Sequence, residues 1–560
     1  MKNVIISMFL IVLMALSVAS YALDTLKVAA LPPGNLNNVI NADTVAGGFT
    51  KPNRIYLLQQ TTELDTVYFV TAPISVKGNV FMVGKINPTT GHPPVIVPSI
   101  AADNSSIDHF FEPQGDDTIS IKGLYFMGTR TDGVSFTGRF VSPQGDNNVF
   151  YADYCVIENI SGAGTPNVFD TWNRDHSSFY ITNCIFRNMH DDNIGNPGFA
   201  WVDPTPFPCD TAKFYNNTFF VFGGNVLGSS GFGAAYVDFQ HNTVFGTNAS
   251  VMNLPQMTNV TVKNNIFYNT FCASVPMSWG PTPGGWGSGV FPIDSLGTVL
   301  ADPYNFTEAD RQITITNNAY WWSSEILDEW TRIDGMGIEG VSPLYRPDFI
   351  SAQPGMGTDN ALYPSVTFAD NDRTDPGFDA TLVSTTSSAL ASVVETSWAN
   401  GSALGERAYY QPLSNPPTWD GVDADWASKQ GYPVPENLRY SATLLGDDGK
   451  PLGDLNWFPE YLTSVSEQPN PLPTTHSLSQ NYPNPFNPTT QIVYTLPAKM
   501  KADLIVYDLT GREVNVIHQG TQQAGQHVVT FDGRGLSSGV YFYVLKTETF
   551  TESRKMLLLK

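Results

Sequence analysis

A strand-sized motif recurs through the first half of the chain, and this repeat constrains the fold more than any other feature. Seven segments place apolar residues at alternate positions: TISIKGLYF, FYADYCVI, FYITNCIF, AKFYNNTFF, VDFQHNTVF, VTVKNNIFY and ITITNNAYW. The paired apolar positions are Ile119/Ile121, Phe150/Ala152, Phe179/Ile181, Ala212/Phe214, Val237/Phe239, Val260/Val262 and Ile313/Ile315. Their second members are 31, 29, 33, 25, 23 and 53 residues apart. Such alternation is typical of strands with one buried face, and irregular repeats of this length are typical of a solenoid. The sequence predicts an all-β protein built on a right-handed parallel β-helix.

An asparagine or a substitute follows the strand in most copies of the repeat. These positions are Asn183, Asn216, His241, Asn264 and Asn317. Stacked amides at a turn can bond to one another from coil to coil, which satisfies polar groups that would otherwise be buried without partners. We therefore interpret these residues as structural and not as a catalytic site.

The charge balance excludes some classes of partner. The chain has 560 residues, a formal net charge of -23 and only 14% charged residues. A field of this sign repels phosphate, so nucleic acid and anionic lipid surfaces are not expected as partners. An acidic surface fits an exported protein that could also hold divalent cations.

The first residues predict a secretory signal peptide. Residues 1–22 begin with Lys2, continue through an apolar run from Val4 to Leu16 and end in small residues at Ala19 and Ala22. This segment is too short to be a membrane anchor with a globular flank. We expect cleavage after Ala22, and no later segment is expected to anchor the chain in a membrane.

The four cysteines form no metal-binding or redox motif. Cys155 and Cys184 occupy the same place in consecutive copies of the repeat, DYC and TNC. They should therefore stack about one strand spacing apart, roughly 4.8 Å. Both a disulfide and a pair of small buried apolar side chains are compatible with this spacing.

The rest of the chain divides into regions of different composition. Residues 23–462 form the predicted β-helix with loop insertions, the longest between Thr270 and Arg311, and a helix is expected over 382–399. The segment GDDGKPLGDLNWFPEYL is expected to cap the coil stack, because a last strand would otherwise expose an unpaired edge. Residues 463–477 hold several prolines and predict a linker. Residues 478–560 show the alternation and turns of a small antiparallel β-sandwich.

Three segments of this last region carry a specific resemblance. YPNPF at 482–486, YDLTGREV at 507–514 and the closing SSGVYFYVLK and KMLLLK resemble the C-terminal sorting domain of the type IX secretion system. The resemblance implies that residues 478–560 engage the type IX secretion machinery. It further implies export across both membranes of a Gram-negative cell, removal of this domain, and release of the body or its attachment to the outer surface.

The body resembles the pectate-lyase-like superfamily of right-handed β-helix proteins at the level of its repeats and turn asparagines. That superfamily includes polysaccharide lyases, glycoside hydrolases, epimerases and non-catalytic adhesins, so fold alone leaves the function open. The arginine-centred motif of pectate lyases and the spaced aspartates of polygalacturonases are not found in this sequence. No residue role is carried over from the resemblance.

The densest cluster of reactive residues lies in FDTWNRDHSS and FRNMHDDNIGNPGFAWVDP, in consecutive coils. Lysis of a polyuronate needs a cation that neutralises the carboxylate and a base that takes a proton, whereas hydrolysis needs two facing carboxylates. The candidate catalytic residues are Asp175, His176, Arg187, His190, Asp191 and Asp192. Asp191, Asp192 and Asp203 could supply oxygen ligands to Ca²⁺.

Aromatic residues in the loops favour a glycan ligand. Flat rings with a polar edge suit stacking against sugars, although the same rings could pack loops onto the solenoid. The candidate substrate-binding residues are Trp172, Arg174, Trp201, Trp279 and Trp286. Two hypotheses remain: an enzyme that cleaves or modifies an acidic polysaccharide, as a lyase or a hydrolase, and a non-catalytic adhesin or structural protein of the cell surface.

Overall fold

The computed structural model divides the chain into two compact units, Met1–Thr463 and Ser464–Lys560, which we call the body and the C-terminal domain. The structure describes residues 24–29, 35–51, 54–59, 67–87, 93–99, 107–128, 136–162, 168–169, 176–191, 209–222, 226–227, 234–247, 250–252, 257–272, 291–293, 311–338, 342, 350–352, 366–378, 380–398, 443–458, 461, 477–478, 481, 486, 488–496, 500–522, 525–548 and 550–559. The predicted signal peptide, most of the insertion at 270–311 and the linker except Ser477 lie outside these residues.

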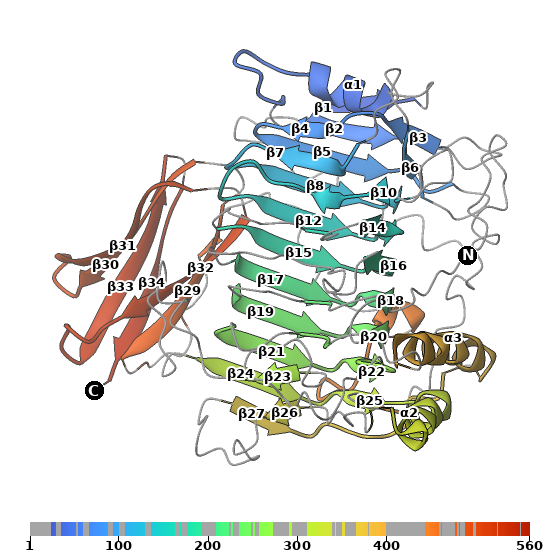
Figure 1. The fold of residues 1–560 in the computed structure, drawn as a ribbon. Helices are drawn as coiled ribbons and strands as arrows, with labels where there is room; N and C mark the ends of the chain where they lie inside the picture. The colour runs from blue at the N-terminus through green and yellow to red at the C-terminus, as the bar shows by residue number, and fades with distance from the viewer. Residues whose placement is uncertain are drawn as a thin grey trace, which may run out of the picture. The chain divides into compact units, whose positions relative to one another are not determined.

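The body is a stack of parallel coils, with one strand of each coil in a first long sheet (Figure 1). The strands of this sheet, in spatial order, are β1 (Asp24–Val28), β2 (Arg54–Leu58), β5 (Asn79–Gly84), β8 (Thr118–Lys122), β12 (Val149–Asp153), β15 (Ser178–Thr182), β17 (Cys209–Tyr215), β19 (Ala234–Gln240), β21 (Asn259–Lys263), β24 (Gln312–Thr316) and β27 (Val366–Ala369). The register aligns the apolar pairs of the repeat, for example Phe150 with Phe179 and Ala152 with Ile181. The predicted parallel β-helix is confirmed.

A second long sheet and a short third sheet complete the coils. The second sheet contains β3 (Val67–Val70), β6 (Val95–Pro98), β9 (Tyr125–Met127), β13 (Val156–Glu158), β16 (Ile185–Asp191), β18 (Thr218–Phe222), β20 (Thr243–Thr247), β22 (Ile266–Tyr268) and β25 (Ala319–Trp321), with β10 (Phe136–Thr137) and β14 (Ile160–Gly162) beside it. The third sheet contains β4 (Ile74–Val76), β7 (His109–Pro113) and β11 (Arg139–Val141), and β23 (Phe291–Ile293) pairs with β26 (Ile350–Ala352).

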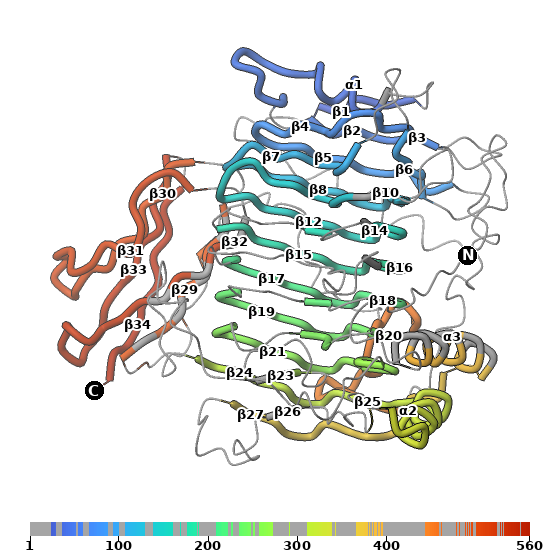
Figure 2. Tube along the Cα trace, viewed as in Figure 1, coloured from blue at the N-terminus to red at the C-terminus, as the bar shows by residue number. Residues whose placement is uncertain are grey.

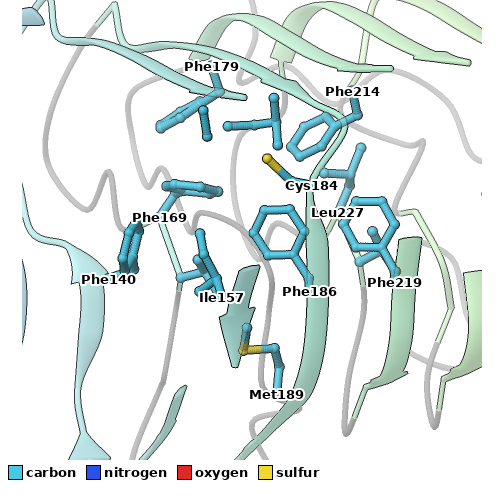
Figure 3. Packing of buried hydrophobic residues seen from close by; sticks show 14 of the residues in the cluster. Phe140, Ile157, Phe169, Phe179, Cys184, Phe186, Met189, Phe214, Phe219 and Leu227 are labelled. Carbon is cyan, nitrogen blue, oxygen red and sulfur yellow. The ribbon is translucent and has the colours of Figure 1, made fainter. Parts of the chain in front are cut away.

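The core lies inside the coils and is rich in stacked aromatic rings (Figure 3). The rings of Phe186 and Phe219 have centroids 5.2 Å apart at an interplanar angle of 10°, and Phe219 lies 5.7 Å from Phe239. Cys155 and Cys184 are free thiols buried in this core, and the Cys155 backbone N–H donates to Cys184 Sγ at 3.4 Å. The two cysteines therefore act as small core residues and form no disulfide.

The turn after the first sheet holds two adjacent columns of polar residues. The predicted positions adopt left-handed backbone conformations, as at Asn183 with φ 52° and Asn216 with φ 61°, and the Asn216 amide donates to Asn183 Oδ1 at 2.6 Å. The next residue in each coil forms a buried column, which we call the asparagine ladder. Its members are Asn217, Asn242, Asn265, Asn318 and Asn371.

The asparagine ladder is continuous through its hydrogen bonds. The Asn217 backbone N–H and side-chain amide donate to Asn242 Oδ1 at 3.0 and 2.9 Å, and Asn242 repeats this pattern on Asn265. Each amide also donates to a strand carbonyl, such as Asn242 to Phe214 O at 2.9 Å. The ladder thus satisfies polar groups that the turn buries.

Helix α1 (Asn35–Ala42) lies at the first coils of the stack, and α2 (Ser324–Met336) and α3 (Ala380–Trp398) lie beside its last coils (Figure 1). Helix α1 buries Leu36 and Ile40 against the first coils. Helix α2 packs against α3, and α3 matches the helix predicted over 382–399. Within the described residues, no helix is both long enough and apolar enough to span a bilayer.

Residues 443–458, which we call the strap, follow a path that differs from the predicted end cap (Figure 2). The strap runs along the asparagine turn of coils in the middle of the stack: Gly453 N donates to Asn264 O at 2.8 Å, and Leu455 N donates to Asn216 Oδ1. His241 Nε2 lies 3.0 Å from Asp448 Oδ2. The turn presents backbone and side-chain carbonyl oxygens along its length, and the strap amides of Gly453 and Leu455 bind two of them.

The C-terminal domain consists of two antiparallel sheets. One contains β28 (Ser477–Leu478), β29 (Thr489–Leu496) and β32 (Gly525–Asp532), and the other contains β30 (Met500–Asp508), β31 (Glu513–Gln522), β33 (Gly539–Thr547) and β34 (Thr551–Leu558). A separate apolar core includes Leu504, Tyr543 and Phe531. The predicted all-β domain with antiparallel strands is confirmed.

Candidate functional site

Most of the residues selected from the sequence lie outside the described part of the chain. These are Trp172, Arg174, Asp175, Asp192, Trp201, Asp203, Trp279 and Trp286. For His190 and Asp191 the structure gives the backbone position: both lie at the end of β16, where they pair with Ser161 and Gly162 of β14. His176 and Arg187 are described with their side chains.

Arg187 is a buried residue of the second sheet. Its side chain is 4% exposed and its Nε donates to Glu158, whose side chain is fully buried. One terminal nitrogen donates to the Tyr125 hydroxyl at 2.6 Å. Burial raises the pKa of Tyr125 well above its usual value, so this phenol stays protonated. The guanidinium is therefore held by protein groups on two neighbouring strands, β13 and β9, whereas the sequence had suggested a catalytic role.

His176 forms a pair that the sequence did not predict. It lies at the turn before β15, with φ 59°, and its Nδ1 is 2.9 Å from Asp210 Oδ1 on β17. Each of the two side chains is 37% exposed. A carboxylate at this distance orients an imidazole through a hydrogen bond. Asn147 occupies the same turn position one coil earlier and Asp116 two coils earlier, and both have the same left-handed backbone conformation. His176 therefore also continues a column of polar turn residues, in which Asn147 donates to Asp116.

The outward side of the first sheet, over β8 to β24, carries aromatic and polar side chains, and we call it the outer face. Tyr151 and Tyr180 occupy matching positions in consecutive coils, with ring centroids 4.9 Å apart and an interplanar angle of 14°. This centroid distance is larger than a carbon–carbon contact of about 3.5–4 Å, so the rings are offset and each presents part of its face and edge. Both side chains are half-buried.

The tyrosine pair is connected to the His176 pair. The Tyr180 and Thr211 hydroxyls are hydrogen bonded, and the Asp210 carboxylate lies close enough to act on Tyr180 electrostatically. Burial raises the pKa of Tyr180 and of Tyr151 above the usual value for a phenol. Both hydroxyls therefore remain protonated at neutral pH and can donate hydrogen bonds to a ligand.

The next positions of the same row are charged and paired. Lys213 follows Tyr180 in register on β17, and its Nζ is 3.7 Å from Asp238 on β19. Beside them Lys122 of β8 contacts Asp153 of β12 at 2.5 Å. The sequence signal for this face was present, because Tyr151 and Tyr180 stand between the apolar residues in the copies FYADYC and FYITNC. The candidate binding residues predicted from the sequence lie in the loops instead.

A calcium site stays a prediction. Within the residues that the structure describes, no three His, Cys, Asp or Glu side chains gather as a metal site would require. Two of the three proposed ligands, Asp192 and Asp203, lie outside those residues. The side chains that the outer face presents are hydroxyls, amides and ion pairs.

The fold and its C-terminal domain define a class of protein: an exported β-solenoid that carries a separate domain for its secretion. Residues 480–559 match the family described as the secretion system C-terminal sorting domain. The protein is thus a substrate of type IX secretion, and it is delivered to the cell surface or the extracellular space. No curated protein was found to match the chain by sequence.

Proposed function

We propose that this secreted protein binds polysaccharide on the outer face of its β-helix. The observation that carries the proposal is the stacked pair of Tyr151 and Tyr180 on the outward side of the first sheet. An aromatic ring with a polar tip offers a ligand both an apolar surface and a hydrogen-bonding group. A sugar ring has the matching features, an apolar face and hydroxyl groups.

The repetition of the coils supports a polymeric ligand. Outward positions recur in register about 4.8 Å apart along the solenoid, as in any parallel sheet. Thr211, Tyr236 and Asn259 form one such row beside the tyrosines. A chain of sugars can contact several coils in succession, and weak contacts summed over coils give useful affinity because one chain makes them all.

The test is retention of the full chain by polysaccharides embedded in a native gel, with and without the tyrosine pair. Replacing Tyr151→Ala and Tyr180→Ala together should weaken binding at least about tenfold, since each aromatic contact contributes of order 1 kcal/mol. Tyr507→Ala is the matched control, because Tyr507 is a half-buried tyrosine on β30 of the C-terminal domain. Equal loss in both variants, or retention unchanged in the double variant, would contradict the proposal.

A catalytic role has one supporting observation, the pair of His176 and Asp210 beside Tyr180. An oriented imidazole next to a protonated phenol could act as base and acid on a bound glycan. Incubation of the full chain with polysaccharides should then release unsaturated products or new reducing ends. Those products should disappear in His176→Ala while retention in the gel persists. If no substrate gave products, the catalytic role would be contradicted and only the binding function would stand.

A further inference from the structure

The lysines of the outer face are matched by carboxylates. Lys122 contacts Asp153 at 2.5 Å and Lys213 lies 3.7 Å from Asp238, each from the neighbouring coil. Lys263 of β21 contacts Asp447 of the strap. Side chains directly opposite one another on adjacent strands interact, so the Lys122–Asp153 and Lys213–Asp238 pairs follow from the register of the sheet. The described lysines of this face therefore add no net positive charge to it.

The remaining side chains of the outer face are neutral hydrogen-bonding groups. The middle row of outward positions continues from Asp238 to Thr261 and Thr314, and Gln240 of the next row donates to Asp238 at 2.5 Å. The Tyr151 and Tyr180 phenols stay protonated. Hydroxyl and amide groups in this arrangement can pair with sugar hydroxyls, and they carry no positive charge that would neutralise a carboxylate or a sulfate.

The groups that could recognise an acidic sugar are already engaged. The guanidinium of Arg187 is buried against Glu158, and His176 is paired with Asp210. A polyuronate would have to displace protein carboxylates from the lysines, and it would approach a chain of net charge -23. Like charges at this density disfavour binding and slow the encounter.

We infer that the ligand of the outer face is an uncharged polysaccharide, such as a β-glucan, xylan or mannan, and not an acidic one. This inference rests on the proposed function. It differs from the acidic glycan that the sequence had suggested, because the sequence could not show that each cation would meet a carboxylate from the next coil.

The experiment compares neutral and acidic polymers in the same native gel assay. The full chain is run through gels that contain a mixed-linkage β-glucan, xylan, galactomannan, polygalacturonate or alginate, at low and at high salt. We expect retention by at least one neutral polymer that changes less than about twofold with salt, because contacts between uncharged groups are not screened. Retention by the acidic polymers should be absent at both salt concentrations.

A charge variant sharpens the comparison. Asp153→Asn with Asp238→Asn frees Lys122 and Lys213 while it preserves side-chain size. This double variant should gain retention on polygalacturonate that high salt abolishes. Lys546→Ala, on the C-terminal domain, serves as a charge control away from the outer face.

The outcomes distinguish a failure of the inferred ligand class from a failure of the proposed binding function. Retention of the parent chain by polygalacturonate or alginate that depends on Tyr151 and Tyr180 would overturn the ligand class and keep the proposed function. Retention by no polymer would overturn both. Retention by a neutral polymer that survives loss of both tyrosines would place binding elsewhere and overturn the inference for the outer face.

Discussion

The strap offers a prediction whose size can be worked out from its contacts. Asp454 is 1% exposed, and its carboxylate accepts from Thr218 Oγ1 at 2.6 Å and from the Asn456 backbone N–H at 2.9 Å. The second bond caps the short 3₁₀ helix Leu455–Trp457. Replacing Asp454→Ala removes both bonds and leaves a buried hydroxyl donor at Thr218. We expect the strap to open more often.

The expected cost is the sum of two contributions. Loss of a helix N-cap costs about 1 kcal/mol, and a buried donor left without its partner costs about 1–3 kcal/mol. The total of about 2–4 kcal/mol corresponds to a roughly 30- to 1,000-fold increase in the opening equilibrium, since 1.4 kcal/mol is a factor of ten. Lys450→Ala is the control: its ion pair with Asp448, at 3.8 Å, is exposed and should contribute no more than about 1 kcal/mol.

The stability of the closed strap should also depend on pH. Burial raises the pKa of Asp454 from 3.8 to about 7. Between these values the closed strap holds a proton that the open strap releases, so closing is favoured at low pH and weakens as pH rises towards 7, with no further change above it. The difference is at most about 4 kcal/mol. Asp454→Asn cannot ionise and should remove this dependence.

Hydrogen exchange followed by mass spectrometry measures the opening directly. Peptides from 443–458 report the amides of Gly453, Leu455 and Phe458, which donate to the asparagine turn or within the strap. After correction for intrinsic exchange, protection in the parent chain should fall from pH 5 to pH 7.5. A change below about threefold in Asp454→Ala, or protection that rises with pH, would refute the reasoning.

Three further changes test the packing of the body by chemical denaturation. Asn242→Ala breaks the asparagine ladder on both sides and should cost about 3 kcal/mol or more, and a cost under about 1 kcal/mol would show that the ladder is not continuous. Glu158→Gln leaves the buried cation of Arg187 without its carboxylate and should cost about 3–5 kcal/mol, part of which the added change Arg187→Met should recover. Gly246→Ala should cost about 1–3 kcal/mol because Gly246 has φ +75° and its Cβ would lie 2.9 Å from Leu390; a neutral effect would contradict the packing of α3 on β20.

The coils could be predicted because each copy of the repeat carries its own evidence. Alternate apolar residues such as Ile181 and Phe214 specify which face of a strand is buried, and copies at similar spacing fix the register. The helix α3 was also visible from its apolar stripe. The C-terminal domain could be recognised from its sequence segments, because they occur in order at the end of the chain.

The strap and the ion pairs could not be predicted, because they depend on contacts between distant residues. Asp454 meets Thr218 across 236 positions of the sequence, and nothing local to either residue indicates this contact. Arg187 lies in a segment rich in reactive residues, and this suggested a catalytic role. Its partner Glu158 lies one coil earlier, opposite Arg187 in the second sheet, and both side chains are buried, which the sequence does not show. The neutrality of the outer face follows from the same register and becomes visible only when the coils are stacked.

The outer face is the central claim, and hydroxyl-radical footprinting of the full chain tests it most directly. The side chains of Tyr151 and Tyr180 are half-buried and should be oxidised in the free protein. With a saturating neutral polysaccharide, Tyr151, Tyr180 and Tyr236 should be protected, while the half-buried Tyr507 of the C-terminal domain keeps its reactivity. Protection confined to peptides outside the first sheet, with Tyr151 and Tyr180 as reactive as before, would contradict the account.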